Sequence, residues 1–223
     1  MTEPRVCVNK STIGRAILSV MTKGHRSHKR IVRSGLELAS QRGLSRVTLG
    51  ELASRVAMSK SGLFAHFASK VALQIELLDS AEATLLDHVV TPCADLPRGL
   101  PKLRGVVDRW LDWARSAGLP GGCPLYAATF ELDDMPGPAR DHLVRRHEAW
   151  TELLAGLVRD AVDEGHLPPG TDPVQVVRAL EGIYLAHHVA WRFTNDPDAT
   201  RRARTAVEAL FAPTPPDPRK DRP

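Results

Sequence analysis

Residues 48–70 read TLGELASRVAMSKSGLFAHFASK and carry the clearest structural pattern in the chain. Thr48, with a glutamate three residues later, forms a capping box, the pattern that opens a helix. Ser59 caps a second short segment, in which Leu63 and Phe67 are four residues apart and can face inward together. Two short helices joined by a tight turn, each with a thin apolar stripe, predict a helix-turn-helix that packs against the preceding helix.

The second helix is predicted to leave small and polar side chains on its outer face. These are Lys60, Ser61, Gly62, Ala65 and His66. Side chains of this size can enter a DNA major groove without a clash. Gly62 costs about 1 kcal/mol inside a helix relative to alanine. Close approach of the backbone to a partner and tight packing between helices both explain this glycine, and both readings stay open.

Charge is unevenly distributed along the chain. Residues 1–70 contain 13 Lys and Arg against 3 Asp and Glu, whereas residues 71–223 contain 17 against 23. The basic first third favours a polyanionic partner, because clustered lysines and arginines release phosphate counterions on binding. A solvated charged face is the alternative that composition leaves open.

Composition places the chain among globular proteins. It has 223 residues, of which 43% are hydrophobic and 25% charged, enough for one or two domains. No apolar run approaches the ~20 residues that span a bilayer, and the first residues lack a signal-peptide pattern, so a cytoplasmic protein without a membrane partner is expected. Three widely spaced cysteines indicate reduced thiols rather than disulfides or a zinc site.

Helical periodicity continues through most of the sequence, which predicts an all-α fold. Apolar residues at helical spacing predict helices over 29–42, from Lys70 onward, near 102–117, around Leu125–Phe130, over 138–165, from Asp172 onward and after Pro197. Residues 213–223 are rich in proline and charge, and a disordered tail is expected there.

The region from residue 27 to about 75 resembles the DNA-binding domain of the TetR-type (tetracycline-repressor-like) transcriptional regulators. The matching positions are Gly43, Thr48, Leu52, Ala53, Met58, Ser59, Lys60, Leu63, Phe64, His66, Phe67, Ser69 and Lys70. The resemblance implies an all-α homodimer with an N-terminal three-helix helix-turn-helix domain and a C-terminal helical domain for ligand binding and dimerisation. The expected boundaries are a flexible basic extension at 1–24, the DNA-binding domain at 25–72, the ligand-binding and dimerisation domain at 73–212, and the tail at 213–223.

The resemblance also implies residues that touch DNA. The set is Thr48, Ser59, Lys60, Ser61, Gly62, Phe64, His66 and Lys70. Thr48 and Lys70, at two helix N-termini, are expected to hold phosphates, and Lys60 is suited to guanine acceptors. Phe64 stands where the family usually has a tyrosine, so it can offer only apolar contact. Ala57 replaces the usual turn glycine, although a left-handed residue at a turn favours glycine.

Two interpretations fit the aromatic side chains in the C-terminal part: they line a ligand cavity, or they belong to the hydrophobic core. The candidate pocket residues are Trp110, Trp113, Tyr126, Phe130, Trp150, Tyr184, His187 and Trp191. The last two helices are expected to pair across a two-fold axis in the homodimer.

The expected function is a ligand-responsive transcriptional regulator. It would be a repressor that binds a pseudo-palindromic operator as a homodimer and is released by a small apolar or amphipathic inducer. A small helical enzyme with an incidental basic N-terminus is an alternative, but the sequence offers no catalytic, metal or cofactor motif. A thiol-based redox sensor is another, because Cys123 follows two glycines at a predicted helix N-terminus, a position that lowers a thiol pKa.

Overall fold

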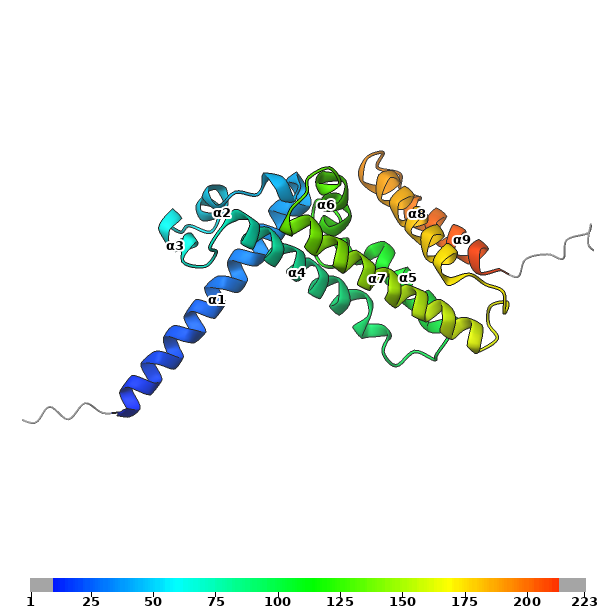
Figure 1. Ribbon diagram of the computed structural model, residues 1–223, viewed down its shortest axis with the longest axis horizontal. Helices are drawn as coiled ribbons and strands as arrows, with labels where there is room; N and C mark the ends of the chain where they lie inside the picture. Colours follow the sequence, from blue (N-terminus) through cyan, green and yellow to red (C-terminus); the bar gives the residue numbers. More distant parts are fainter. Residues whose placement is uncertain (1–9, 213–223) are drawn as a thin grey trace, which may run out of the picture.

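The computed structural model describes residues 10–212, and at residues 10–23 and 25 it describes the backbone alone. Every regular element in this range is a helix, which confirms the predicted all-α class (Figure 1). The elements are α1 Lys10–Arg42, η1 Leu44–Arg46, α2 Leu49–Arg55, α3 Lys60–Phe64, α4 Lys70–Val89, η2 Thr91–Cys93, α5 Leu100–Ser116, α6 Pro124–Leu132, α7 Pro138–Asp163, α8 Pro173–Arg192 and α9 Ala199–Phe211. None of these described helices has both the length and the apolar character that a bilayer span requires.

Helix α1 begins earlier than the apolar pattern predicts. The stripe starts near residue 29, whereas the backbone is helical from Lys10. No proline lies between Lys10 and Arg42, so the backbone meets no residue that would end the helix before the stripe. The expected extension at 1–24 therefore falls partly on α1 and partly on residues 1–9. Residues 1–9 and the expected tail at 213–223 lie outside the described residues.

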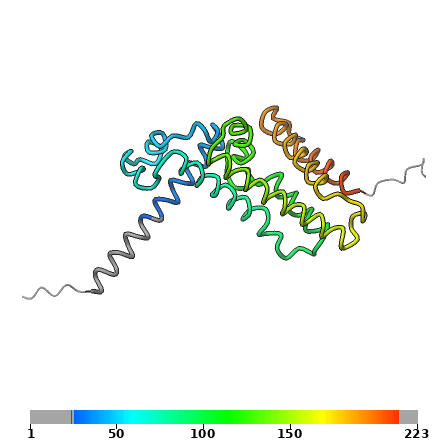
Figure 2. The backbone as a smooth tube through the Cα atoms, in the orientation of Figure 1, coloured from blue at the N-terminus to red at the C-terminus, as the bar shows by residue number. Residues whose placement is uncertain are grey.

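Helices α1, α2 and α3 pack around one apolar core at one end of the molecule, far from the α8–α9 pair (Figure 2). Leu63 and Phe67, expected to face inward, are 0% and 2% exposed. Leu52 and Ala53 of α2 are buried in the same core. Burying these side chains leaves the opposite face of α3 toward solvent.

Side-chain caps set where α2 and α3 begin. Thr48 Oγ1 accepts a hydrogen bond from Glu51 N at 3.2 Å, and Ser59 Oγ accepts one from Gly62 N at 3.0 Å. Each cap satisfies a backbone N–H that has no partner in the first turn. Between the helices Ala57 has φ 54°, so this alanine adopts the left-handed conformation expected of a glycine.

Helix α3 is shorter than predicted. It ends at Phe64 with Ala65 as its C-cap, whereas the sequence pattern extends it to Phe67. The chain tightens because His66 N bonds to Leu63 O at 2.9 Å, a three-residue spacing that closes a turn. Phe67 N still bonds to Leu63 O at 3.2 Å, so Phe67 reaches the core from an irregular last turn.

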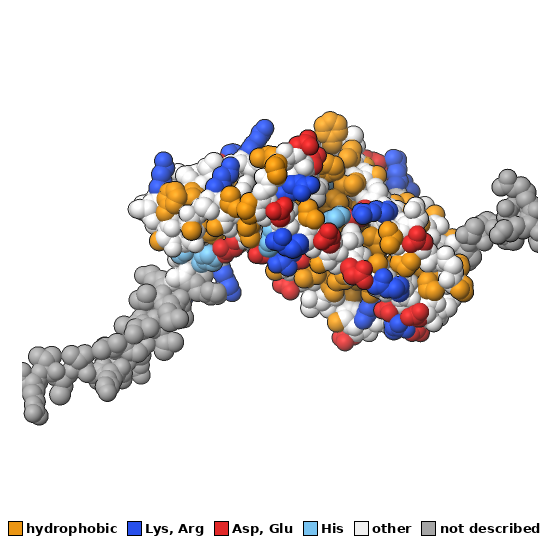
Figure 3. Space-filling view, viewed as in Figure 1, with side chains coloured by type: hydrophobic (Ala, Val, Ile, Leu, Met, Phe, Trp, Pro, Cys, Tyr) orange, Lys and Arg blue, Asp and Glu red, His pale blue; other side chains and the backbone are white. Residues whose placement is uncertain are grey.

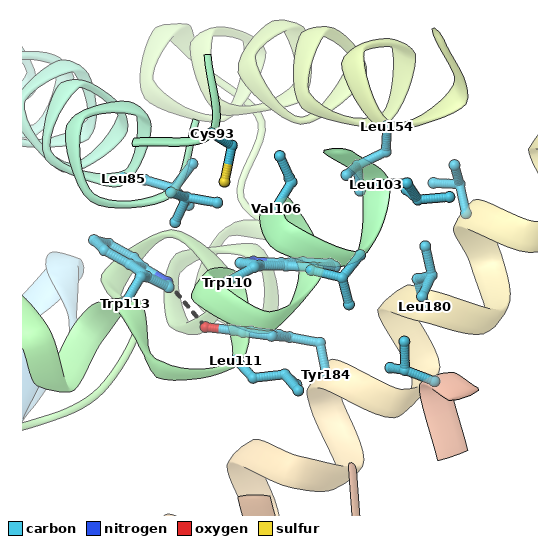
Figure 4. Close-up of a cluster of buried hydrophobic side chains, with 14 of the residues drawn as sticks. Leu85, Cys93, Leu103, Val106, Trp110, Leu111, Trp113, Leu154, Leu180 and Tyr184 are labelled. Carbon is cyan, nitrogen blue, oxygen red and sulfur yellow. Dashed lines mark hydrogen bonds between the residues drawn. The ribbon is translucent and has the colours of Figure 1, made fainter. Parts of the chain in front are cut away.

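The C-terminal helices enclose a second core built around stacked aromatic rings (Figure 4). The Trp110 and Tyr184 rings are parallel, with centroids 4.4 Å apart. Trp113 Nε1 donates a hydrogen bond to Tyr184 Oη at 3.1 Å. Trp110 and Trp113 are both fully buried, so this stack forms the centre of the second core.

Helix α6 joins the two cores. Ala128 and Leu132 are buried in the core around α1, α2 and α3, together with Leu143 of α7. Cys123, the N-cap of α6, and Tyr126 are buried in the second core. A movement of α6 therefore reaches both halves of the molecule.

Candidate DNA-binding surface and ligand pocket

The outward face of α3 presents small, polar and apolar groups to solvent. Lys60 and Ser61 are exposed, and Phe64 is 55% exposed. A methyl group on Gly62 would lie 3.1 Å from Ser59 Oγ, so the N-cap supplies a packing reason for this glycine. Ser61 and Gly62 are small enough to let this face approach a major groove, and Lys60 and Phe64 project from it.

Two residues expected at phosphates also have contacts within the chain. Thr48 Oγ1 caps α2, as described above. Lys70 Nζ donates a hydrogen bond to the backbone oxygen of Ser45 at 2.6 Å while the side chain remains exposed. Lys70 therefore ties the start of α4 to η1.

His66 does not lie on the outer face of α3, where the sequence pattern places it. Because α3 ends at Phe64, His66 falls in the following turn and is half-buried beside α1. Its ring centroid is 5.5 Å from that of His28 and 6.4 Å from that of Phe67. This placement corrects the predicted position of His66 on α3, while its contact with DNA stays a prediction. Lys60, Ser61 and Phe64 are the exposed candidates on α3 itself.

Acidic side chains offset part of the basic charge around the helix-turn-helix. Glu51 pairs with Arg42, and Glu37 contacts both Arg33 and Arg55. Lys and Arg side chains still stand out from this end of the visible face in Figure 3. Arg33, Arg42 and Arg55 therefore serve the fold with at least part of their charge.

Two adjoining pockets lie among the C-terminal helices. The inner pocket is narrow and is lined by Glu82, Leu85, Leu125, Tyr126, Thr129, Leu143, Arg146, His147 and Trp150. The outer pocket is wider and more open, and it shares four of these residues. Its other lining residues are Phe130, Leu132, Asp133, Arg140, Val144, Arg178, Glu181 and Leu185. Hydrophobic side chains gather on the visible face where α6, α7 and α8 meet (Figure 3).

A buried carboxylate organises the polar groups between the two pockets. Glu181 is 7% exposed and accepts hydrogen bonds from Tyr126 Oη at 3.1 Å and Arg178 Nη1 at 2.8 Å. His147 Nε2 lies 3.3 Å from the same carboxylate. Burial, reinforced by the negative charge of Glu181, raises the pKa of the Tyr126 phenol far above its usual value. Tyr126 therefore stays protonated and acts as a donor.

A second ion-pair group joins the pocket wall to α4. Arg146 of α7 contacts Asp79 and Glu82 of α4, each at 2.9 Å. His142 Nε2 lies 2.8 Å from the same Asp79 carboxylate. Since α4 begins next to the helix-turn-helix, these contacts connect the pocket directly to the α2–α3 end of the molecule.

The aromatic candidates separate into two groups. Tyr126, Phe130 and Trp150 line the pockets. Trp110, Trp113 and Tyr184 form the buried stack, His187 lines a groove between α8 and α9, and Trp191 packs under Arg115 with a ring-to-guanidinium distance of 4.9 Å. The polar lining residues Arg146 and His147 of α7 and Arg178 and Glu181 of α8 were not predicted, because the two pairs are more than 30 positions apart and only folding brings them together.

The environment of Cys123 is opposite to the one expected of a reactive thiol. Cys123 caps α6 through a hydrogen bond from Tyr126 N to Sγ at 3.4 Å, and the side chain is 1% exposed. Burial raises the pKa of the thiol and outweighs the helix N-terminus. The described residues also contain no group of three or more His, Cys, Asp or Glu side chains placed to hold a metal ion.

Comparison with known families identifies both halves of the chain. A model described as "Bacterial regulatory proteins, tetR family" matches residues 31–77, and one described as "Tetracyclin repressor-like, C-terminal domain" matches residues 99–207. The chain belongs to the TetR family. Members of the TetR family are DNA-binding transcriptional regulators and not enzymes, so the enzyme alternative is removed.

Individual relatives of this TetR-family chain are distant. The nucleoid occlusion factor SlmA of Haemophilus influenzae is 30% identical over 95 residues, so the match spans 42% of this chain and less than half, 44%, of SlmA. The crystal structure of a TetR regulator from Chloroflexus aurantiacus has a TM-score of 0.77 at 19% identity, covering 85% of this chain and 96% of that one. AibR, solved in complex with isovaleryl coenzyme A and operator DNA, has a TM-score of 0.66 at 18% identity, covering 84% and 100%. At these identities the solved structures show the fold alone.

Proposed function

We propose that this protein is a ligand-responsive repressor that binds a pseudo-palindromic operator as a homodimer in the cytoplasm. Residues 25–72 form its DNA-binding domain and residues 73–212 its ligand-binding and dimerisation domain. The observation that carries the proposal is the exposed face of α3, held outward by the buried side chains of Leu63 and Phe67. In each subunit α3 enters a major groove, and the dimer spaces the two copies about one DNA turn apart, ~34–36 Å.

Residues around α3 have separate tasks in the proposed complex. Lys60 reads guanine acceptors, and Ser61 lies next to it on the exposed face. Phe64, 55% exposed, offers an apolar contact to a thymine methyl or a sugar. Thr48 and Lys70 hold phosphates at the starts of α2 and α4.

Helices α8 and α9 form the proposed dimer interface. Val189 on α8 and Phe193, the C-cap of α8, are 53% and 83% exposed. A neighbouring groove between the two helices is lined largely by small side chains, among them Ala186 and Ala206. A two-fold axis would bring the same apolar surface of a second subunit against these residues.

The two adjoining pockets are proposed to hold a small amphipathic effector. Leu85, Leu125 and Trp150 offer an apolar surface for one part of the molecule. Arg178 and Glu181 line the wider outer pocket and offer hydrogen-bonding groups for another part. The complex of AibR with isovaleryl coenzyme A, an acyl thioester, supports an effector with both parts. Effector binding would favour a conformation with the wrong spacing of the two α3 helices, and DNA affinity would fall.

Selection of bound duplexes from random DNA with the purified full-length chain tests the proposal. We expect a pseudo-palindromic consensus, with half-sites about one helical turn apart, bound by two subunits. A monomeric protein, or equal affinity for all duplexes at moderate ionic strength, would contradict it. Gel-shift titration of the selected duplex at several salt concentrations separates base recognition from phosphate attraction.

A further inference from the structure

The end of α6 makes a contact across the two halves of the molecule that the proposed function does not use. Glu131, near the C-terminus of α6, accepts hydrogen bonds from two consecutive backbone N–H groups of η1. Leu44 N lies 3.0 Å from Oε1, and Ser45 N lies 2.8 Å from Oε2. One carboxylate of the ligand-binding half thus holds the start of the helical turn that leads into α2.

Gly43 makes this contact possible. It has φ 89°, a conformation that side chains rarely adopt, and a Cβ at this position would overlap the Glu131 carboxylate. The absence of a side chain at residue 43 lets both carboxylate oxygens reach the backbone of η1.

The other side of η1 faces Lys70. The backbone oxygen of Ser45 accepts the hydrogen bond from Lys70 Nζ, while its N–H donates to Glu131. Thr48, the cap of α2, follows Ser45 by three residues. The short η1 segment therefore links Glu131 to both residues proposed to hold DNA phosphates.

Helix α6, which carries Glu131, also contributes a residue to the pocket wall. Thr129 lines both pockets and precedes Glu131 by two residues on the same helix. Ala128 and Leu132, on the same helix, are buried in the DNA-binding core. Because a packed helix moves as a unit rather than bending, displacement of Thr129 also displaces Glu131.

We infer that Glu131 is a positioning residue that carries displacement of α6 by an effector to η1, and from there to Thr48 and Lys70. The inference rests on the proposed function, since it concerns how pocket and DNA surface are coupled. Movement of the carboxylate either pulls the Leu44 and Ser45 amides with it or breaks their hydrogen bonds. In both cases the residues beside the phosphates change position and DNA affinity falls.

A pocket-filling substitution can replace the unidentified effector in the test. Thr129→Phe adds volume at the wall shared by both pockets. It is made in the full-length chain with Glu131 intact, with Glu131→Ala and with Glu131→Gln, which keeps the side-chain size and one acceptor oxygen. Asp134→Asn is the matched control, because Asp134 is an exposed acid three residues after Glu131. Affinity for the selected duplex and hydrogen exchange over residues 43–48 are measured for each protein.

With Glu131 intact, or with Asp134→Asn, Thr129→Phe is expected to weaken DNA binding at least about fivefold. With Glu131→Ala the same substitution should change affinity by less than about twofold, and Glu131→Gln should give an intermediate response. An equal loss of affinity with and without Glu131 would overturn the inference and assign coupling to the Arg146 contacts with α4. No loss of affinity on filling the pocket with Glu131 intact would overturn it as well.

Hydrogen exchange separates this inference from the proposed function. Thr129→Phe should speed exchange of the Leu44 and Ser45 amides when Glu131 is present, and Glu131→Ala should speed it without any change in the pocket. If the parent chain selects no DNA sequence, the proposed function fails, and the exchange result still decides whether α6 controls η1. Unchanged exchange in Thr129→Phe would overturn the inference even if DNA binding is normal.

Discussion

At the scale of single residues, Ala57 stores strain at the turn between α2 and α3. Ala57 and Asn195 are the non-glycine residues with positive φ in the described range, with φ 54° and 53°. A left-handed conformation costs an L-residue about 1–2 kcal/mol. The turn is nevertheless formed, because Leu52 and Leu63 on either side of it are fully buried.

Ala57→Gly is expected to raise the free energy of unfolding by about 0.5–1 kcal/mol, since relief of strain exceeds the greater chain entropy of glycine. Urea denaturation followed by circular dichroism measures this change. Ala83→Gly is the control, because Ala83 is exposed within α4 and its replacement should lower stability by about 1 kcal/mol. A loss of stability in Ala57→Gly would contradict the argument from strain.

Lys60 and Lys70 should behave differently on replacement. Lys60→Ala is expected to relax base preference at one operator position, at a cost of about 1–3 kcal/mol for the preferred sequence. Lys70→Ala should weaken binding evenly across sequences and reduce the salt slope by about 1, because its proposed contact is a phosphate. Gel-shift titrations on the selected site and on single-base variants distinguish the two. Unchanged affinity in either variant would count against the role given to that lysine.

The Cys123 thiol is expected to react slowly in the folded protein. Burial raises its pKa and blocks access, so at pH 7–8 the thiolate is scarce and enclosed. Mass spectrometry after iodoacetamide treatment should find Cys123 unmodified in buffer and modified in concentrated urea. Rapid modification of Cys123 in the folded chain would contradict this expectation and favour the hypothesis of a redox sensor.

The loop between α5 and α6 fixes the start of α6 against α1. Gly121 N donates to Ser40 Oγ at 3.2 Å, and Arg33 Nη2 donates to the oxygen of Ala117 at 2.9 Å. A Cβ on Gly121 would overlap the Ser40 backbone. Close approach of two backbones therefore requires glycine and holds the N-terminal end of α6 in place.

Gly121→Ala should lower the free energy of unfolding by about 1–3 kcal/mol, because the overlap is with backbone and cannot be relieved by a rotamer change. Thermal unfolding measures the loss. Gly170→Ala is the control, since a Cβ at Gly170 meets nothing within 4 Å and should leave stability nearly unchanged. Equal stability of the two variants would show that the loop can move away from α1 without cost.

In the whole molecule, a dimer would bind DNA more tightly than a monomer, because it joins two α3 helices that each bind weakly. Each α3 is five residues long and reads a short half-site. Joining two such contacts raises overall affinity by about 10²–10⁴ when their spacing matches the DNA. The exposed apolar surface of α8 is the proposed means of joining them.

Val189→Glu with Phe193→Glu is expected to give a monomer and to weaken operator binding by about 10²-fold or more, because charges would be buried at the proposed interface. Light scattering after gel filtration reports the mass. Met135→Glu is the control, since Met135 is 54% exposed between α6 and α7. A double variant that remains dimeric would place the interface elsewhere.

Short-range patterns in the sequence predict most of the helices and the helix-turn-helix. Caps at Thr48 and Ser59 and the pair Leu63 and Phe67 were correctly predicted, because capping and helical spacing act within a few residues. The length of α3 and the place of His66 were not predicted, because His66 packs beside His28 of α1, a contact that the local pattern does not contain.

The pockets, the burial of Cys123 and the contact of Glu131 with η1 depend on long-range packing and could not be predicted from local patterns. The pockets combine side chains from α4, α6, α7 and α8, and no local period relates these helices. Desolvation by the second core overrides the helix N-terminus at Cys123. Glu131 meets Ser45 across 86 residues of sequence, and packing of α6 between two cores brings them together. The pKa of Cys123 and the hydrogen bonds of Glu131 are set by neighbours that are distant in sequence and that folding brings close.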